Sequence, residues 1–188
     1  MKIKSILLNE AIELVDIVTN AKHLHTLLKS TKKMGNLPVL YRGFKGIKPG
    51  LNFITNDTTD YRGRNQPSQI VIDQLTQQFN TPVKQPVFTT FNKRNALDFG
   101  VPHFFIPTLP FTALQNAEVD DLLVDVNEKG IQHILPGYDT NIKPNKSEEI
   151  LMFTKHYYLI TIPWLKMKSY NKTIKTYADL NKSLHYLL

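Results

Sequence analysis

The chain has 188 residues, 41% of them hydrophobic, which is typical of one domain with a buried core of its own. Because it contains no cysteine, the sequence excludes disulfides, thiolate nucleophiles and cysteine-ligated zinc, and it suits a reducing compartment. A net charge of +7, from 23 basic and 16 acidic residues, favours a polyanionic ligand such as a nucleic acid, a nucleotide or an acidic protein surface. No apolar run is long enough to span a membrane, so we expect a soluble, cytoplasmic protein.

The first part of the chain predicts two helices and one strand. Apolar residues at helical spacing indicate a helix over 9–29, which the following serine, threonine and lysines end. The apolar residues 37–41 predict a strand that ends at an Arg-Gly pair, and 44–50 reads as a loop. The polar stretch 51–66 predicts no element, and a proline then opens a helix over 67–79.

A second strand is expected at 86–91, where β-branched and aromatic residues predominate. Asn92 is a good cap for a short helix at 93–100, and we expect Ala96 and Phe99 of that helix to point inward.

The later part of the chain predicts mostly strands. Residues 101–106 and 157–162 are expected to be strands, and 176–187 a closing helix. At least one helix is expected within 111–135, followed by a loop at 136–146 whose length is typical of functional loops. The sum is an α+β fold, and the whole chain, 1–188, is expected to form a single domain.

The stretch 145–154 places two adjacent glutamates at the start of an apolar strand. Strand alternation would put Ser147 and Glu149 on one face and Glu148 on the other. Such an acid pair is commonly just the solvated end of a strand, and this interpretation stays open.

Three segments occur in a set order along the chain. They are Tyr41-Arg42-Gly43, then Phe88-Thr89-Thr90 followed by Ala96 and Phe99, and last Ser147-Glu148-Glu149-Ile150-Leu151. Together they resemble the ADP-ribosyltransferase superfamily, in its Arg–Ser/Thr–Glu branch, and most of all its small phage-encoded members. The resemblance covers 37–46, 86–100 and 145–155. It implies a split β-sheet core with N-terminal helices around an NAD cleft.

The resemblance also implies roles for individual residues, with NAD as the substrate. Glu149 would stabilise the oxocarbenium-like ribose that forms when nicotinamide leaves, and Glu148 is the fallback for this role. Arg42 would pair with an NAD phosphate, and the Gly43 backbone would approach the nicotinamide amide closely. Tyr41, beside them, belongs to the same cofactor-binding set.

Further roles fall on flanking positions. Thr89 would hydrogen-bond to the glutamate and the nicotinamide pocket, with Thr90 bracing the strand. Arg64 would assist at the pyrophosphate. Ser147, Tyr138 and Glu148 would face the acceptor. No residue spacing indicates a metal site, a phosphate loop, a dinucleotide-binding glycine motif or a serine nucleophile.

Two departures from the family pattern keep several functions open. Ser147 stands where the family commonly has Glu or Gln, and Phe91 replaces a third polar residue. The expected activity is transfer of ADP-ribose to a macromolecular acceptor, a host protein or a nucleic acid, by a phage or bacterial effector in the host cytoplasm. The alternatives are an NAD glycohydrolase, or a non-catalytic, virion-associated protein that binds nucleic acid or a protein partner. The basic run 166–172 is a possible surface for such binding.

Overall fold

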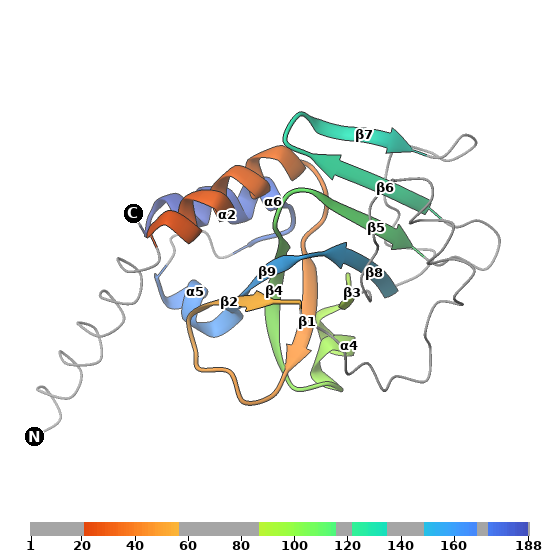
Figure 1. Ribbon diagram of the computed structural model, residues 1–188. Coiled ribbons are helices and arrows are strands. Elements are labelled where there is room, and N and C mark those ends of the chain that lie inside the picture. Colours follow the sequence, from red (N-terminus) through yellow and green to blue (C-terminus); the bar gives the residue numbers. More distant parts are fainter. Residues whose placement is uncertain (1–20, 57–86, 116–121, 135–148, 169–172, 188) are drawn as a thin grey trace, which may run out of the picture.

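The structure, a computed structural model, describes residues 21–56, 87–115, 122–134, 149–168 and 173–187 (Figure 1). These residues form a mixed α+β fold, as the sequence predicts. Its elements, in chain order, are α2 (Ala21–Met34), β1 (Leu40–Phe44), β2 (Leu51–Thr55), β3 (Val87–Thr90), α4 (Lys93–Leu97), β4 (Val101–Pro107), β5 (Phe111–Gln115), β6 (Leu122–Asn127), β7 (Gly130–Ile134), β8 (Glu149–Thr154), β9 (His156–Thr161), α5 (Ile162–Lys168) and α6 (Tyr177–His185).

The nine described strands form one antiparallel sheet in the order β2-β9-β4-β1-β3-β8-β5-β6-β7. It divides into a first half-sheet, β2-β9-β4-β1, and a second half-sheet, β3-β8-β5-β6-β7. The two meet where β1 pairs with β3, through the single register pair of Tyr41 with Thr90. In Figure 1, β1 and β4 run down the view, while β5 and β6 run across it. β8 of the second half-sheet and β9 of the first are successive parts of one chain segment, interrupted only at Lys155.

Buried hydrogen bonds hold the chain at this interruption. The Thr154 hydroxyl lies 2.7 Å from the His156 carbonyl oxygen and 3.2 Å from that of Thr108. The Thr108 hydroxyl also donates to the His156 carbonyl, at 2.8 Å. The Asn56 side-chain amide donates to the Thr154 carbonyl, and its backbone N–H donates to the Lys155 carbonyl. Backbone groups that lose their ladder partners at the bend therefore find other partners.

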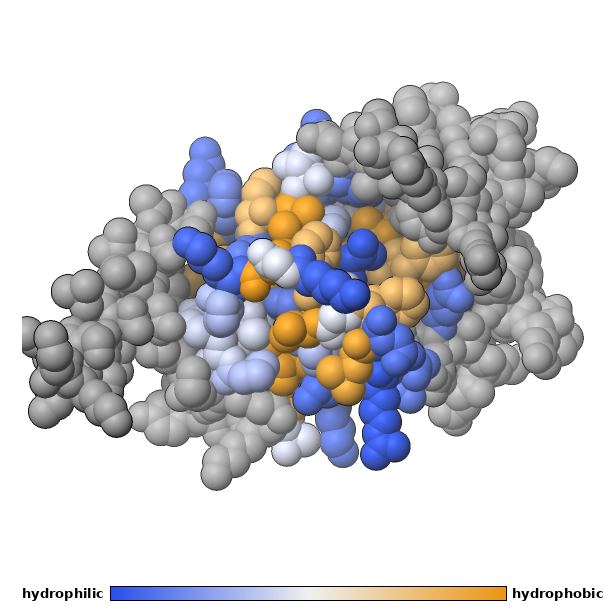
Figure 2. Space-filling view, turned by 90° about the horizontal axis from the view of Figure 1, so that it is seen from below, coloured by the Kyte–Doolittle hydropathy of each residue, from blue (hydrophilic) through white to orange (hydrophobic). Residues whose placement is uncertain are grey.

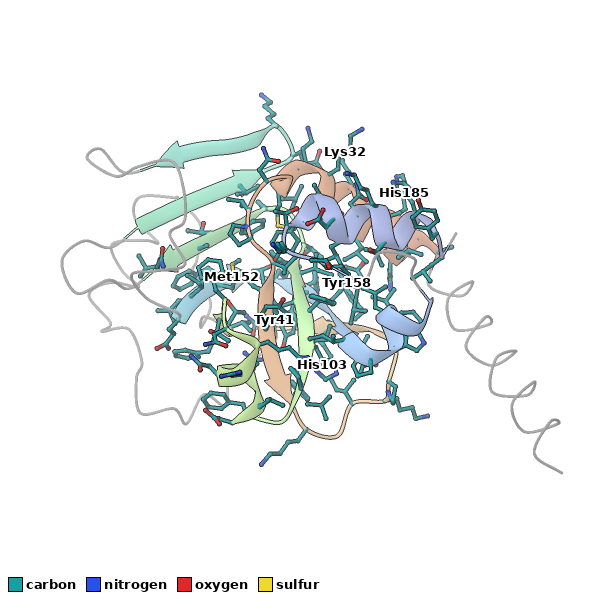
Figure 3. All side chains as sticks on the ribbon, turned by 180° about the vertical axis from the view of Figure 1, so that it is seen from behind. Lys32, Tyr41, His103, Met152, Tyr158 and His185 are labelled. Atoms are coloured by element: carbon teal, nitrogen blue, oxygen red, sulfur yellow. The ribbon has the colours of Figure 1, made fainter. Side chains whose placement is uncertain are left out.

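Helices α2 and α6 lie side by side against the sheet (Figures 1 and 3). Leu24 and Leu27 of α2, and Leu180 of α6, are almost fully buried between them and the strands. Tyr177 ties α6 to β4, because its buried hydroxyl donates to the Phe105 carbonyl at 2.7 Å. Burial raises the pKa of Tyr177 well above its ordinary value, so the hydroxyl keeps its proton.

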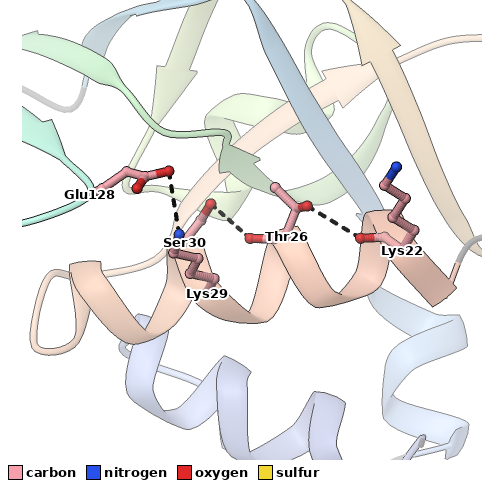
Figure 4. Close-up of polar contacts among 5 residues, drawn as sticks. All are labelled: Lys22, Thr26, Lys29, Ser30 and Glu128. Atoms are coloured by element: carbon pink, nitrogen blue, oxygen red, sulfur yellow. Dashed lines mark hydrogen bonds and ion pairs between the residues drawn. The ribbon is translucent and has the colours of Figure 1, made fainter.

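Helix α2 extends further than the sequence predicts. The pattern suggested an end at residue 29, whereas the helix continues to Met34. Ser30 and Thr31 are polar yet buried. The Ser30 hydroxyl donates to the Thr26 carbonyl at 3.0 Å (Figure 4), and the Thr31 hydroxyl donates to the Leu28 carbonyl at 3.0 Å. This back-bonding lets hydroxyl side chains sit inside a helix.

The prediction of a helix within 111–135 is wrong. This region contains β5, β6 and β7, which follow one another as antiparallel neighbours. Its apolar runs are too short to distinguish a helix from a strand by periodicity. Pairing of β5 with β8 settles the choice, and it buries the whole of Phe111–Gln115.

Other boundaries also differ from the predictions. Strand β1 is Leu40–Phe44, so Phe44 lies in a strand rather than in the expected loop. β2 lies in the stretch predicted to have no element, and α5 was not predicted. Phe99, expected to point inward, is 72% exposed.

The other helices and strands predicted within the described residues are present, with ends that differ by a few residues. The strands expected at 86–91, 101–106 and 157–162 are β3, β4 and β9, and residues 150–153 of β8 are buried as expected. The Asn92 cap and α4 are present, and α6 begins at a capping box formed by Thr176 and Asp179. The predicted helix 67–79 and the predicted loop 136–146 lie outside the described residues.

Candidate functional site

The three segments that carry the family resemblance converge on neighbouring strands. β1, β3 and β8 are adjacent in the sheet, although β1 and β8 are about a hundred residues apart in the chain. Tyr41 lies opposite Thr90, and Thr90 lies opposite Glu149. Since residues directly opposite one another in antiparallel strands share a face, these three residues form a row across the sheet. We call Tyr41, Thr90 and Glu149 the transverse row.

Glu149 is the charged member of the row. It is an exposed residue at the first position of β8, and Ile150 and Leu151 directly after it are buried. Partial burial of its carboxyl raises the pKa of Glu149. The Glu149 carboxyl group is held on a rigid strand, and its ionisation is disfavoured by burial. Such a group is suited to stabilise a cation or to exchange a proton.

Thr89 and Thr90 lie on opposite faces of β3, and it is Thr90 that lies opposite Glu149. Thr89 faces the core, only 4% exposed, and its hydroxyl donates to the Ile150 carbonyl at 2.9 Å. Thr90 is half-buried and lies opposite Glu149. Its hydroxyl oxygen accepts the Asn92 backbone N–H at 3.0 Å. These contacts favour the reverse of the expected assignment, because Thr89 braces the strand and Thr90 lies opposite Glu149.

Arg42 connects the two half-sheets. Its Nη1 donates to the Phe88 carbonyl of β3 at 2.9 Å, and its guanidinium carbon lies 5.9 Å from the ring centroids of both Phe44 and Tyr157. Burial raises the pKa of Tyr157, and the Arg42 charge partly opposes this rise. Strand alternation places Arg42 on the face opposite to Tyr41. Pairing of Arg42 with a phosphate remains a prediction.

Gly43 has a structural requirement that the sequence did not reveal. A Cβ atom at this position would lie 1.9 Å from the Ala96 carbonyl oxygen and 2.9 Å from the Phe99 Cβ. Helix α4 thus packs directly on the β1 backbone, which only a glycine permits. The expected approach of Gly43 to nicotinamide stays a prediction.

His103 is a titratable group that belongs to none of the sequence motifs described above. It is Arg42's register partner on β4, it is almost fully buried, and its Nδ1 lies 2.7 Å from the Val101 carbonyl oxygen. Desolvation lowers the pKa of His103, which favours a neutral ring beside the Arg42 strand. No motif marked this histidine, and only the strand pairing could have identified it.

The remaining predicted positions are distributed as follows. Tyr41 is half-buried, its ring centroid lies 5.5 Å from that of Phe104, and burial raises its pKa. Arg64, Ser147, Glu148 and Tyr138 lie outside the described residues. Within the described residues, no His, Asp and Glu side chains gather as a metal site, and no helix is long and apolar enough to cross a membrane.

Comparisons of the chain with protein-family models, with curated proteins and with solved structures each found no match.

Proposed function

We propose that this protein transfers ADP-ribose from NAD to a macromolecular acceptor, a host protein or a nucleic acid, as an effector encoded by a phage or a bacterium. The observation that supports the proposal is the transverse row. Three segments selected by their resemblance to ADP-ribosyltransferases lie far apart in the chain, yet they occupy adjacent strands with Tyr41, Thr90 and Glu149 in register. The division of the sheet into two halves also agrees with the split core that the resemblance implies.

The chemistry requires a group that stabilises positive charge on the ribose. The bond between ribose C1′ and the nicotinamide nitrogen breaks, and its electron pair leaves with nicotinamide. A nucleophilic atom of the acceptor then bonds to C1′ and releases its proton to water. The Glu149 carboxylate stabilises the oxocarbenium-like centre between these events. Thr90, directly opposite, is the hydroxyl placed to orient Glu149 or the ribose.

Phosphate binding by Arg42 is the less direct part of the proposal, because alternation along β1 puts Arg42 on the face opposite to Tyr41 of the transverse row. The guanidinium already donates to the Phe88 carbonyl, so a phosphate has to share or replace this contact. Arginine is suited to such a change of partner, because its planar guanidinium has several N–H donors that can bond to a carbonyl oxygen or to phosphate oxygens.

The test is incubation of the protein with NAD labelled in its adenylate part, with and without a bacterial lysate. We expect release of nicotinamide and label on a protein or RNA band, both reduced by about a hundredfold or more in Glu149→Gln, since such charge stabilisation typically contributes this much. Glu128→Gln is the matched control, because Glu128 is an exposed carboxylate on the β6–β7 turn.

An isosteric pair sharpens the assignment of the threonines. Thr90→Val removes a hydroxyl from the transverse row, and we expect turnover to fall by about tenfold or more. Thr89→Val removes a hydroxyl that faces the core, and we expect turnover per folded molecule to stay close to that of the wild type. Nicotinamide release without labelled macromolecules would identify an NAD glycohydrolase instead. A wild type that neither binds nor consumes NAD would refute the proposed activity.

A second candidate is a non-catalytic binding protein with the same fold. Two contacts favour it. Arg42 donates a hydrogen bond to the Phe88 carbonyl, and the lack of a side chain at Gly43 lets α4 pack on β1. Both residues thus have structural reasons that need no NAD. Calorimetric titration with NAD separates the candidates, because this second function requires that no NAD binds.

A further inference from the structure

An apolar patch is exposed where α4 leads into β4. Leu97, Phe99 and Val101 are 55%, 72% and 51% exposed, although large hydrophobic side chains elsewhere in the described residues are mostly buried. We call these three residues the α4–β4 patch. Figure 2, which views the molecule from the end where β1 and α4 lie in Figure 1, shows apolar residues gathered among hydrophilic ones on this face.

Two glycines, Gly43 and Gly100, allow the backbone beneath the patch to pack closely against its neighbours. Gly43 lets α4 pack on β1, and a Cβ at Gly43 would lie only 2.9 Å from the Phe99 Cβ. Gly100 has φ +132°, and a Cβ there would lie 2.7 Å from the Phe44 carbonyl group. Val101 in turn pairs with Phe44 in the β1–β4 register. Phe99 therefore projects outward from a supported backbone rather than from a loose loop.

Basic side chains surround the patch. Lys45 reaches over Gly100, because its Cγ lies 2.9 Å from the position of a Cβ there. Lys93 is one helical turn before Leu97 on α4, and Arg94 comes directly after Lys93. The side chains of Lys45, Lys93 and Arg94 are all exposed. Asp98 is the acidic residue among them. The patch thus combines an exposed phenyl ring with an excess of positive charge, as does the whole chain with its net charge of +7.

We propose that the α4–β4 patch binds single-stranded nucleic acid, with an unpaired base stacked on Phe99 and neighbouring phosphates paired with Lys45 and Lys93. Aromatic rings among cations bind single strands in this way, and a duplex cannot offer the face of a base. A protein partner fits less well, since specific interfaces cover about 800 Å² of each partner and three side chains supply only part of that. The site goes beyond the proposed transfer reaction because binding needs no NAD.

The test is fluorescence anisotropy with labelled oligothymidylate of about 20 nucleotides, longer than the ~4–16 that one binding module contacts. A duplex of the same length serves as the comparison. We expect tighter binding of the single strand, weakened roughly tenfold or more in Phe99→Ala and kept within about twofold in Phe99→Tyr, because stacking needs only a ring. Lys45→Gln should make the slope of log affinity against log salt shallower by about 0.7.

Matched variants elsewhere on the surface complete the experiment. Tyr186→Ala removes another exposed aromatic ring and Lys22→Gln another exposed cation, and neither should change the affinity for oligothymidylate. Wild-type affinity in Phe99→Ala would overturn the proposal, as would a duplex that binds as tightly as the single strand. Self-association that Phe99→Ala abolishes, without oligothymidylate binding, would overturn it in favour of a second copy of the chain. Because no NAD is present, these outcomes are independent of the transfer activity.

Discussion

At the scale of single residues, Glu149 combines exposure with a carboxyl group that is partly desolvated. Its pKa is raised by burial, so the folded state disfavours the charge that the proposed chemistry needs. A carboxylate whose pKa is raised by burial lowers the stability of the fold at neutral pH, and removing its charge relieves that cost.

We therefore predict that Glu149→Gln is at least as stable as the wild type at neutral pH while it loses activity. A carboxyl whose folded-state pKa is raised contributes stability below its unfolded-state pKa, about 4.3, and loses that contribution as the pH rises through the folded-state value. The variant should therefore be more stable than the wild type at pH values above the folded-state pKa of Glu149, and this difference should vanish at pH values below the unfolded-state pKa. Urea unfolding of both proteins at neutral and acidic pH measures the difference. A variant that is clearly less stable at neutral pH would contradict the assignment.

At the scale of elements, the packing of α4 on β1 shapes both proposed sites. The helix follows Thr90 of the transverse row by way of its Asn92 cap, and it ends in Leu97, the first residue of the α4–β4 patch. Gly43 is the contact point, because the Ala96 carbonyl occupies the space of a side chain. This arrangement couples a backbone position on one strand to the position of a whole helix.

Gly43→Ala should therefore destabilise the protein by about 1–3 kcal/mol or more, the usual effect of forcing a methyl group into occupied space. Gly46→Ala is the control. A Cβ at Gly46 meets nothing within 4 Å, and only its φ of +80° makes alanine unfavourable, which costs roughly 1 kcal/mol. Chemical denaturation compares the two variants, and an equal or smaller loss for Gly43→Ala would show that α4 can shift without cost.

At the scale of the whole molecule, the chain passes from the second half-sheet to the first where β8 gives way to β9. Thr154, Thr108 and Asn56 supply the hydrogen bonds that the interrupted ladder lacks. All three are polar and buried, so each contact replaces one that water would otherwise make.

Thr154→Val should lower the free energy of unfolding by about 0.5–1.5 kcal/mol, because it keeps the shape of the side chain and removes a buried hydrogen bond, while the His156 carbonyl keeps its donors from Thr108. Thr55→Val, at an exposed position of β2, should change it by no more than about 0.5 kcal/mol. Urea unfolding measures both. Equal effects would mean that the network does not hold the two half-sheets.

Much of the local structure could be predicted from the sequence. The cap at Asn92 and the strands at β3, β4 and β9 have strong local signals, and they are present. The region 111–135 was misassigned because short apolar runs fit either a helix or a strand, and the pairing partner that decides between them lies elsewhere in the chain.

The sequence by itself determined the mixed α+β class and the three ordered segments of the candidate site. Only the tertiary structure decided that these segments are neighbours, and that Thr90 rather than Thr89 lies opposite Glu149. The reason is physical: alternation along a strand shows which residues share a face, but the register between strands and the burial of each face depend on contacts across the whole sheet. The same contacts turned Phe99 outward and made Gly43 a packing residue.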